Sequence, residues 1–155
     1  MKPPTIYADT SVFGGAFDPE FDNASKALFD MVRRGQAQLL ISDITRKEIA
    51  DAPAQVRDLL DEMLPYIRLV PIDEEILNLR DAYLAADIVT KNWADDAGHV
   101  AAATVAEADL IVSWNFHHIV HYDKIRWYNS VNGMNGYRAI DVRSPNEVIE
   151  YEEGL

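Results

Sequence analysis

Thr5-Ile6-Tyr7-Ala8-Asp9, near the N-terminus, is a short apolar segment that ends in an acidic residue. The segments Gln38-Leu39-Leu40-Ile41 and Leu110-Ile111-Val112 likewise contain runs of consecutive apolar residues. Strands that do not alternate between apolar and polar residues are typical of parallel sheets that are buried on both faces. We therefore predict an α/β fold in which helices cover both faces of a parallel sheet.

The remaining elements follow from apolar residues at helical spacing and from Gly and Pro as stop signals. Helices are expected at 23–34 and between Pro53 and Pro65. Further helices are expected to begin after Ser42 or Asp43 as a cap, at Asp73, at Asp95-Asp96 and at Ser144-Pro145. Further strands are expected at 67–70 and within 137–142. Gly14-Gly15 is expected to break the chain in a loop, and the unassigned segment 116–136 has turn signals at Asn132-Gly133 and Asn135-Gly136.

The composition limits the classes of partner. The chain has 155 residues and a formal net charge of −12, from 14 Lys and Arg against 26 Asp and Glu. This excess of acid disfavours a protein that holds nucleic acid by bulk charge, and it favours metal ions or a basic protein segment as partners. The sequence has no Cys, which excludes disulfides and thiolate metal sites.

Domain organisation and location are also indicated by the sequence. No composition break or repeat divides the chain, so we predict a single domain at residues 1–149 and an acidic tail at residues 150–155. No apolar run approaches the length of a membrane span, and residues 1–5 lack the apolar segment of a secretory signal. We expect a cytoplasmic protein that does not contact a membrane.

Polar residues follow three of the predicted strands at the point where each strand ends. These residues are Asp9, Ser42-Asp43 and Ser113-Trp114-Asn115. In open α/β sheets, ligands bind beyond the carboxyl ends of the strands, where the strand order reverses. We therefore expect a functional site among these polar residues at the carboxyl edge of the sheet, which we call the rim.

Each polar candidate also has an ordinary structural interpretation. Asp9 can be a turn residue that accepts backbone N–H groups, and Glu48 can be a solvated helix residue. Asp95 and Asp96 begin a helix, where its dipole stabilises carboxylates; Asp95 is the better cap, and Asp96, four residues before an apolar Val, is the better ligand. Asn115 is either a turn residue or a hydrogen-bond partner of a ligand. The histidines, His99, His117, His118 and His121, are interpreted as packing or surface residues, with contact to a phosphate or a partner as a further option for His118.

Taken together, Asp9, Glu48 and Asp96 are oxygen ligands from separate elements, of the kind that Mg²⁺ and Mn²⁺ prefer. Carboxylates at close range stay ionised only if a cation offsets their repulsion. Metal-assisted hydrolysis of a phosphodiester is the chemistry that fits this set. A phosphatase with an aspartyl nucleophile fits poorly, because a serine stands at position 11 where a second Asp is expected.

Three stretches resemble motifs of PIN-domain ribonucleases. Residues 7–15, YADTSVFGG, resemble the opening motif of that family, and residues 95–103, DDAGHVAAA, resemble its acidic helix start. Residues 113–119, SWNFHHI, resemble the block after the fourth strand in one branch, whose ending is similar to Gly136-Tyr137 and residues 144–149. The resemblance thus extends over nearly the whole chain.

This resemblance implies a PIN-like three-layer α/β/α fold with a central parallel sheet of four or five strands. It implies a Mg²⁺ or Mn²⁺ site at Asp9, Glu48 and Asp96, with Asn115 where many PIN domains have a fourth acid. Many relatives are VapC-type toxins of type II toxin–antitoxin pairs, which cut RNA, are held by a cognate antitoxin and often form homodimers. Thr10 or Ser11 is expected to bond to Asp9 or to a water on the metal, and basic residues are expected to offset phosphate charge; the candidates are Arg46, Lys47 and Lys91.

A second interpretation belongs to another functional class. The chain can be a PIN-fold interaction module with weak or absent nuclease activity that binds a basic partner protein. The acidic charge and the amide at position 115 are compatible with both interpretations. Binding of a divalent metal separates them.

Overall fold

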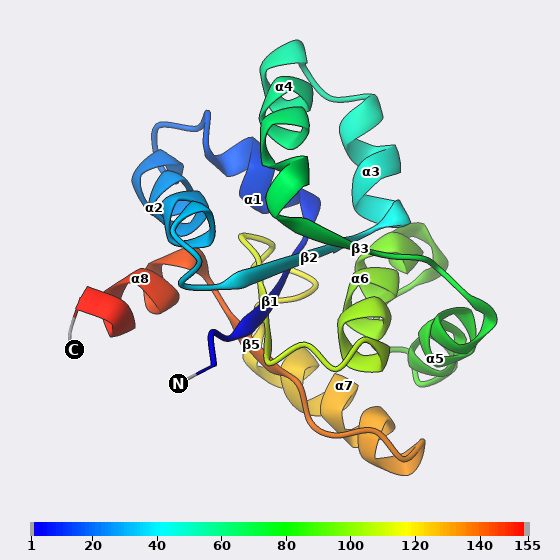
Figure 1. The fold of residues 1–155 in the computed structure, drawn as a ribbon. Coiled ribbons are helices and arrows are strands. Elements are labelled where there is room, and N and C mark those ends of the chain that lie inside the picture. The colour runs from blue at the N-terminus through cyan, green and yellow to red at the C-terminus, as the bar shows by residue number, and fades with distance from the viewer. Residues whose placement is uncertain (1, 154–155) are drawn as a thin grey trace.

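The computed structural model describes the backbone of residues 2–153 and the side chains of residues 2–149. Its centre is a five-stranded parallel sheet with the strand order β3-β2-β1-β4-β5 (Figure 1). The strands are β1 (Thr5–Ala8), β2 (Gln38–Ser42), β3 (Ile67–Val70), β4 (Leu110–Val112) and β5 (Asp141–Arg143). Helices cover both faces of this sheet, so the three-layer α/β/α fold predicted from the sequence is confirmed.

The helices divide between the two faces of the sheet (Figure 1). One face is covered by α5 (Glu74–Ala85), α6 (Ala94–Val105) and α7 (Tyr122–Met134). The other is covered by α1 (Thr10–Gly15), α2 (Asp22–Arg33), α4 (Ala54–Met63) and α8 (Pro145–Glu153). Helix α3 (Asp43–Ala50) follows β2, and the short 3-10 turns η1 (Leu64–Tyr66) and η2 (Lys91–Trp93) precede β3 and α6.

Successive residues of the central strands pack into different cores. Tyr7 packs with α5, α6 and α7, whereas its neighbours Ile6 and Ala8 pack with α1, α2 and α4. All three residues are fully buried. Because successive side chains of a strand point to opposite faces, a strand that is covered on both sides must be apolar throughout. This requirement explains the continuous apolar runs in the sequence.

The strand order reverses at β1. The chain proceeds from β1 through β2 to β3 on one side, and then returns to place β4 and β5 on the other side of β1. Ala8 is in register with Val112, so Asp9 and Ser113 follow at the carboxyl ends of two adjacent strands. This is the crevice at which open α/β sheets bind ligands.

Two loop predictions were wrong. Gly14 and Gly15 lie inside α1 and form no turn. Gly15 is closely packed, because a Cβ at this position would stand 2.7 Å from Nε1 of Trp114. The turn predicted at Asn132-Gly133 lies within α7, because buried contacts to the Asn132 side chain stabilise the helix. The second signal, Asn135-Gly136, does mark the end of α7, and Gly136 has a positive φ of 82°.

Smaller differences concern the ends of elements. Ser42 is the cap of α3, and its Oγ accepts the N–H of Ile44 at 3.2 Å. In the described part of the chain α6 has no side-chain cap, so the prediction that Asp95 caps it was wrong. The predicted tail boundary at residue 150 falls within α8, and residues 154–155 lie outside the described residues. Among residues 2–153, no helix has the length and apolar character needed to span a bilayer.

Candidate functional site

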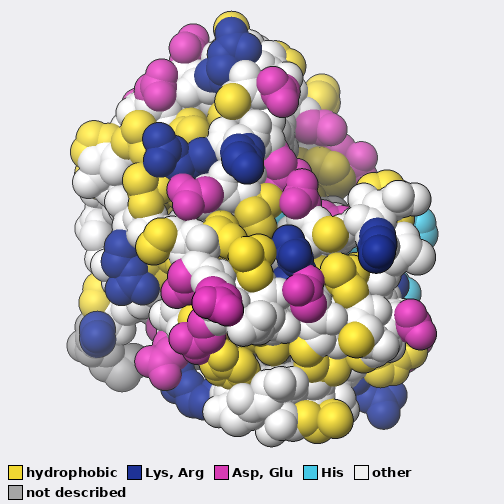
Figure 2. Space-filling model, turned by 90° about the vertical axis from the view of Figure 1, so that its right-hand side faces the viewer, with side chains coloured by type: hydrophobic (Ala, Val, Ile, Leu, Met, Phe, Trp, Pro, Cys, Tyr) yellow, Lys and Arg dark blue, Asp and Glu magenta, His cyan; other side chains and the backbone are white. Residues whose placement is uncertain are grey.

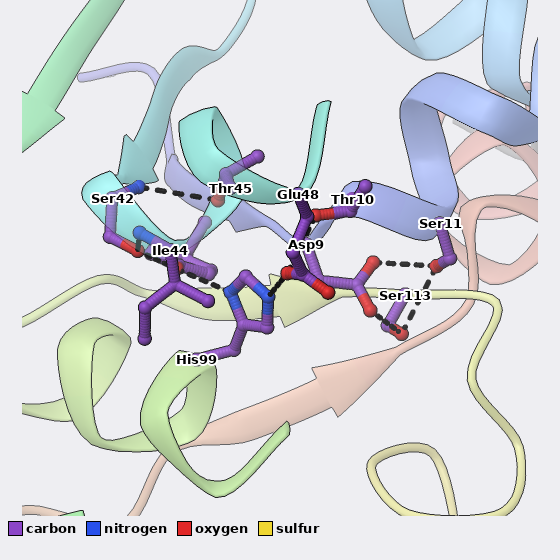
Figure 3. A network of polar contacts seen from close by, with 10 residues as sticks. Asp9, Thr10, Ser11, Ser42, Ile44, Thr45, Glu48, His99 and Ser113 are labelled. Atoms are coloured by element: carbon purple, nitrogen blue, oxygen red, sulfur yellow. Dashed lines mark hydrogen bonds and ion pairs between the residues drawn. The ribbon is translucent and has the colours of Figure 1, made fainter. Parts of the chain in front are cut away.

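Asp9 is held at the carboxyl end of β1 by two serine hydroxyls. Ser11 donates to its Oδ1 at 2.6 Å, and Ser113, from the end of β4, donates to its Oδ2 at 2.8 Å (Figure 3). The residue is only 3% exposed. Although Asp9 stands at the N-cap position of α1, its side chain makes no capping bond within the described residues. The carboxylate is therefore oriented by one hydroxyl group from the first turn of α1 and one from the end of β4, which is more than a turn residue requires.

Glu48 lies on α3 and reaches the same region. Its Oε1 accepts a hydrogen bond from the Thr10 hydroxyl at 2.9 Å and stands 2.6 Å from Nε2 of His99. The side chain is half-buried, with 35% exposed. Of the two residues expected to bond to Asp9, Ser11 does so, whereas Thr10 bonds to Glu48 instead.

His99 connects Glu48 to a buried chain of hydroxyl groups. Its Nδ1 lies 2.7 Å from the Tyr7 hydroxyl, which donates to Ser42 Oγ at 2.7 Å. Figure 3 shows His99 between Glu48 and Ser42. With the Tyr7 hydrogen directed at Ser42, Nδ1 must donate to Tyr7, and Nε2 must donate to the carboxylate of Glu48. Both ring nitrogens then carry a proton, and the imidazole is a buried cation.

The pKa values around His99 agree with this assignment. Burial lowers the pKa of His99, but Tyr7 and the carboxylates of Glu48 and Asp9 outweigh burial and raise it to about 10. Burial raises the pKa of Glu48, and the hydrogen bonds and charge of His99, with the bond from Thr10, leave it below its ordinary value. A protonated His99 is therefore the positive charge among the acids of the rim.

Asp96 lies in the first turn of α6 and is half-buried. Burial raises its pKa, the charges of His99 and His118 and a side-chain interaction with Asn115 lower it, and Glu48 raises it. For Asp9, burial is again the main cause of a raised pKa, and the charge of Asp96 adds to it. The charges of Asp9 and Glu48 each act unfavourably on that of Asp96, so ionisation of these acids is coupled.

The loop after β4 completes the rim. Ser113 Oγ accepts the N–H of Asn115 at 2.9 Å while it donates to Asp9. Oδ1 of Asn115 accepts the N–H groups of His117 at 3.2 Å and His118 at 2.9 Å. The side-chain oxygen of Asn115 thus stabilises a turn, and its amide group is left to interact with Asp96.

The described residues contain no group of three or more His, Asp or Glu side chains arranged to hold a metal ion. The donor types nevertheless fit a hard divalent cation. Each oxygen of Asp9 accepts one of the two hydrogen bonds that it can take, whereas Oε1 of Glu48 already accepts two and Oε2 accepts none from the described residues. Burial of Asp9 and Asp96 favours their neutral forms unless positive charge is supplied. The rim brings the three acids near one another without forming a complete coordination sphere.

The basic residues proposed from the sequence lie on different parts of the surface. Arg46 and Lys47, on α3, line a surface cavity of about 720 Å³ together with Arg80 of α5 and Asp95 of α6. Figure 2 shows this side of the molecule, where hydrophobic side chains gather near the centre among basic and acidic ones. Lys91 is exposed in η2, apart from that cavity.

Sequence reasoning missed His99, which is 1% exposed and central to the site. The residue was interpreted with the other histidines as a packing or surface side chain. Its spacing was the available signal, because His99 follows Asp96 by three residues and residues at that spacing share one helix face. The interpretation as surface or packing residues holds in part for the other histidines. His117 is exposed, and His121 caps α7 through its ring nitrogen.

No protein-family model and no curated protein matches the sequence. Solved structures do match. FitAcB from Neisseria gonorrhoeae aligns over 90% of this chain and 97% of its own, with 17% identity and a TM-score of 0.56. VapBC2 from Rickettsia felis, bound to a DNA fragment from its promoter, aligns over 90% of this chain and 98% of its own, with 13% identity and a TM-score of 0.57. FitAB bound to an IR36 DNA fragment aligns over 90% and 94%, with 17% identity and a TM-score of 0.56.

The fold is PIN-like. The likeness spans most of this chain and nearly all of each neighbour, although few residues are identical. The fold implied by the three sequence motifs is thus confirmed. The candidate site lies at the strand ends of this PIN-like sheet.

Proposed function

We propose that the chain is a VapC-like member of the PIN-domain family, a ribonuclease that hydrolyses phosphodiester bonds of RNA with the help of Mg²⁺ or Mn²⁺. The observation that carries the proposal is the placement of Asp9. Its buried carboxylate accepts hydroxyl groups from the first turn of α1 and from the end of β4, in the crevice where the strand order reverses, and burial together with the charge of Asp96 raises its pKa. Structural roles alone do not require a buried acid to be placed beside another acid.

Within this proposal, Asp9, Glu48 and Asp96 hold the cation. A bound divalent ion lowers the pKa of a water and offsets charge on a phosphate. The residues of the chain supply the orientation: Ser11 and Ser113 orient Asp9, while Thr10 and His99 orient Glu48. The amide group of Asn115, beside Asp96, orients the attacking water or a phosphate oxygen.

Basic side chains near the rim favour a polyanionic substrate. Arg46 and Lys47 lie on the same helix as Glu48 and line a cavity with Arg80. In a chain of net charge −12, a group of cations around a cavity on the helix that carries Glu48 is the arrangement expected if a phosphate backbone must approach. We assign these three side chains to phosphates that flank the cleaved bond.

The structural neighbours favour a role within a toxin–antitoxin pair. The solved structures are of FitAcB and VapBC2, and the latter is bound to DNA of its promoter. We propose that this chain is the toxin of a type II pair and has a cognate antitoxin. The acidic charge favours a basic segment of that partner, and a homodimer is compatible with the same role.

Asp9→Asn tests the nuclease directly. Wild-type protein is expected to cut structured RNAs in the presence of Mn²⁺ and to stop when the metal is chelated. The variant is expected to lose this cleavage, because an amide replaces the carboxylate, while its circular dichroism and Tm show a folded protein. Undiminished cleavage by the folded variant would defeat the assignment of Asp9.

The interaction module is the second candidate function. The observation in its favour is that the described acids are not arranged as a complete metal-binding group, and that Glu48 is already engaged by His99. In that case the rim would bind no divalent cation, and the acidic surface would serve a basic protein partner. Direct measurement of metal binding separates the two functions.

A further inference from the structure

An aromatic stack stands beside the candidate site. The rings of Trp93 and His118 are stacked, with centroids 4.4 Å apart and planes inclined by 27°. His117 extends the row, at 5.1 Å and 35° from His118. We refer to these three rings as the aromatic stack. Two segments that are distant in sequence, η2 and the loop after β4, meet in it.

Both segments also carry residues of the rim. Trp93 immediately precedes α6 and stands three residues before Asp96. His117 and His118 are held by Asn115, whose side-chain oxygen accepts their N–H groups. The charge of His118 acts on Asp96, so the stack borders the acids.

Trp93 is poorly explained as a core residue. It is 49% exposed, whereas Trp114 is 6% exposed and donates to Ser25 Oγ at 2.8 Å. Because His118 covers one face of the Trp93 ring, much of its exposed area must lie on the opposite face and the edges. Nδ1 of His118 is buried without a hydrogen-bond partner among the described residues, so ring stacking is the main contact that holds this imidazole in place. The indole of Trp93 is thus exposed to solvent and is supported on one face by the ring of His118.

We propose that Trp93, supported by His118, is a stacking platform for an unpaired base of single-stranded nucleic acid bound at the rim. This inference rests on the proposed function and names the form of its substrate. Exposed aromatic rings bind unstacked bases of single strands, whereas the bases of a duplex are already stacked on one another. A base on Trp93 would leave its neighbouring phosphate near Asp96 and Asn115.

Positive charges flank the stack. Lys91 lies two residues before Trp93 and is exposed. Lys124, in the first turn of α7, lies six residues after His118 and donates from Nζ to the carbonyl oxygen of Ile88, three residues before Lys91, at 2.7 Å. Since a stacked base brings phosphates on both sides, lysines next to an aromatic ring favour a nucleic-acid strand over an uncharged apolar ligand.

The test is binding of a fluorescein-labelled 2′-O-methyl oligoribonucleotide, which resists cleavage, measured by anisotropy with the metal chelated. Trp93→Ala is expected to weaken binding about 10-fold to 100-fold, the usual loss for one stacked base. Trp93→Phe retains a ring and is expected to keep most of the affinity. Trp127→Ala is the matched control, because Trp127 is also 49% exposed but lies on α7 outside the stack.

A second probe has the same backbone with abasic positions, and the wild-type protein is expected to bind it as weakly as Trp93→Ala binds the normal probe. The inference is overturned if Trp93→Ala binds as the wild type does, if Trp127→Ala loses as much, or if the abasic probe binds equally well. The inference is also overturned if Trp93→Ala loses binding of a protein partner while its binding of the oligoribonucleotide is unchanged. The binding result is independent of the nuclease assay with unmodified RNA. If binding depends on Trp93 but the protein cuts no RNA, the platform is supported and the nuclease is refuted. If the protein cuts RNA but binding does not depend on Trp93, the nuclease is supported and the platform is refuted.

Discussion

At the scale of single residues, His99 supplies positive charge to the acids of the rim. Its protonated ring donates to Glu48 and Tyr7, and its charge lowers the pKa of Asp9, Glu48 and Asp96. A buried cation of this kind is stable only while acceptors surround it. His99 is thus a positioning residue for Glu48.

The pH dependence of stability tests this role. The pKa of His99 is raised in the folded protein to about 10 from its ordinary 6.5, so its stabilising contribution is complete below pH 6.5 and is lost as the pH rises through about 10. His99→Gln is expected to lose about 1.5–3 kcal/mol at neutral pH, because a bond to a charged group is removed. The measurement is urea unfolding across this range with the metal chelated.

The difference in stability between wild type and His99→Gln should therefore shrink as the pH rises from neutral to about 10. Other titrating groups, such as Tyr137, whose pKa is raised to about 12 chiefly by its bond to Glu75, are present in both proteins and cancel. A difference that stays constant with pH would contradict the protonated His99.

The position of Asp9 at the end of β1 could be read directly from the sequence. Prediction failed for His99, because the importance of that ring comes from Tyr7, Ser42 and Glu48, which reach it across elements. The aromatic stack was missed for the same reason. A Trp and a His that are 25 residues apart, at positions 93 and 118, reveal their contact only in three dimensions.

At the scale of elements, apolar runs and stop residues were enough to predict β1 to β4 and most helices. The fifth strand begins at Asp141, four residues after the start of the expected range, and α7 lies in the segment left unassigned. The failures occurred where tertiary contacts override a local signal. Asn132-Gly133 looks like a turn, yet the Asn132 side chain accepts a hydrogen bond from Tyr83 and donates to Thr104 Oγ1 at 3.4 Å inside the core. These buried bonds favour the helix over the turn.

Gly15 offers a test at this scale. A Cβ at this position would meet Trp114 Nε1 at 2.7 Å and Ser25 Oγ at 2.8 Å, and a buried indole cannot move away easily. Gly15→Ala is expected to lower the free energy of unfolding by about 1–3 kcal/mol. Urea unfolding monitored by circular dichroism measures this change.

Gly14→Ala is the matched control for this substitution. The two glycines are neighbours in α1, but none of the described atoms lies within 4 Å of a Cβ built at Gly14. Alanine is the better helix former by about 1 kcal/mol, so this variant is expected to be as stable as the wild type or more so. Equal losses in both variants would mean that α1 itself does not tolerate substitution and that the contact with Trp114 is not the cause.

At the scale of the whole molecule, the fold places the site. The parallel sheet reverses its strand order at β1, and the ends of β1 and β4, with α3 and α6, bring Asp9, Glu48 and Asp96 to one rim. The sequence predicted this rim because polar residues follow its strands. It could not predict which groups bond to the acids, since these are hydroxyls from α1 and the end of β4 and an imidazole from α6.

The central claim is that this rim binds a divalent cation, and calorimetric titration with Mn²⁺ tests it most directly. Asp95→Asn is the matched control for Asp9→Asn, because it removes one charge from an exposed side chain beside Asp96. We predict millimolar or tighter binding by the wild type and by Asp95→Asn, and loss of binding in folded Asp9→Asn. Equal heats from all three proteins, or no heat from the wild type, would contradict the account.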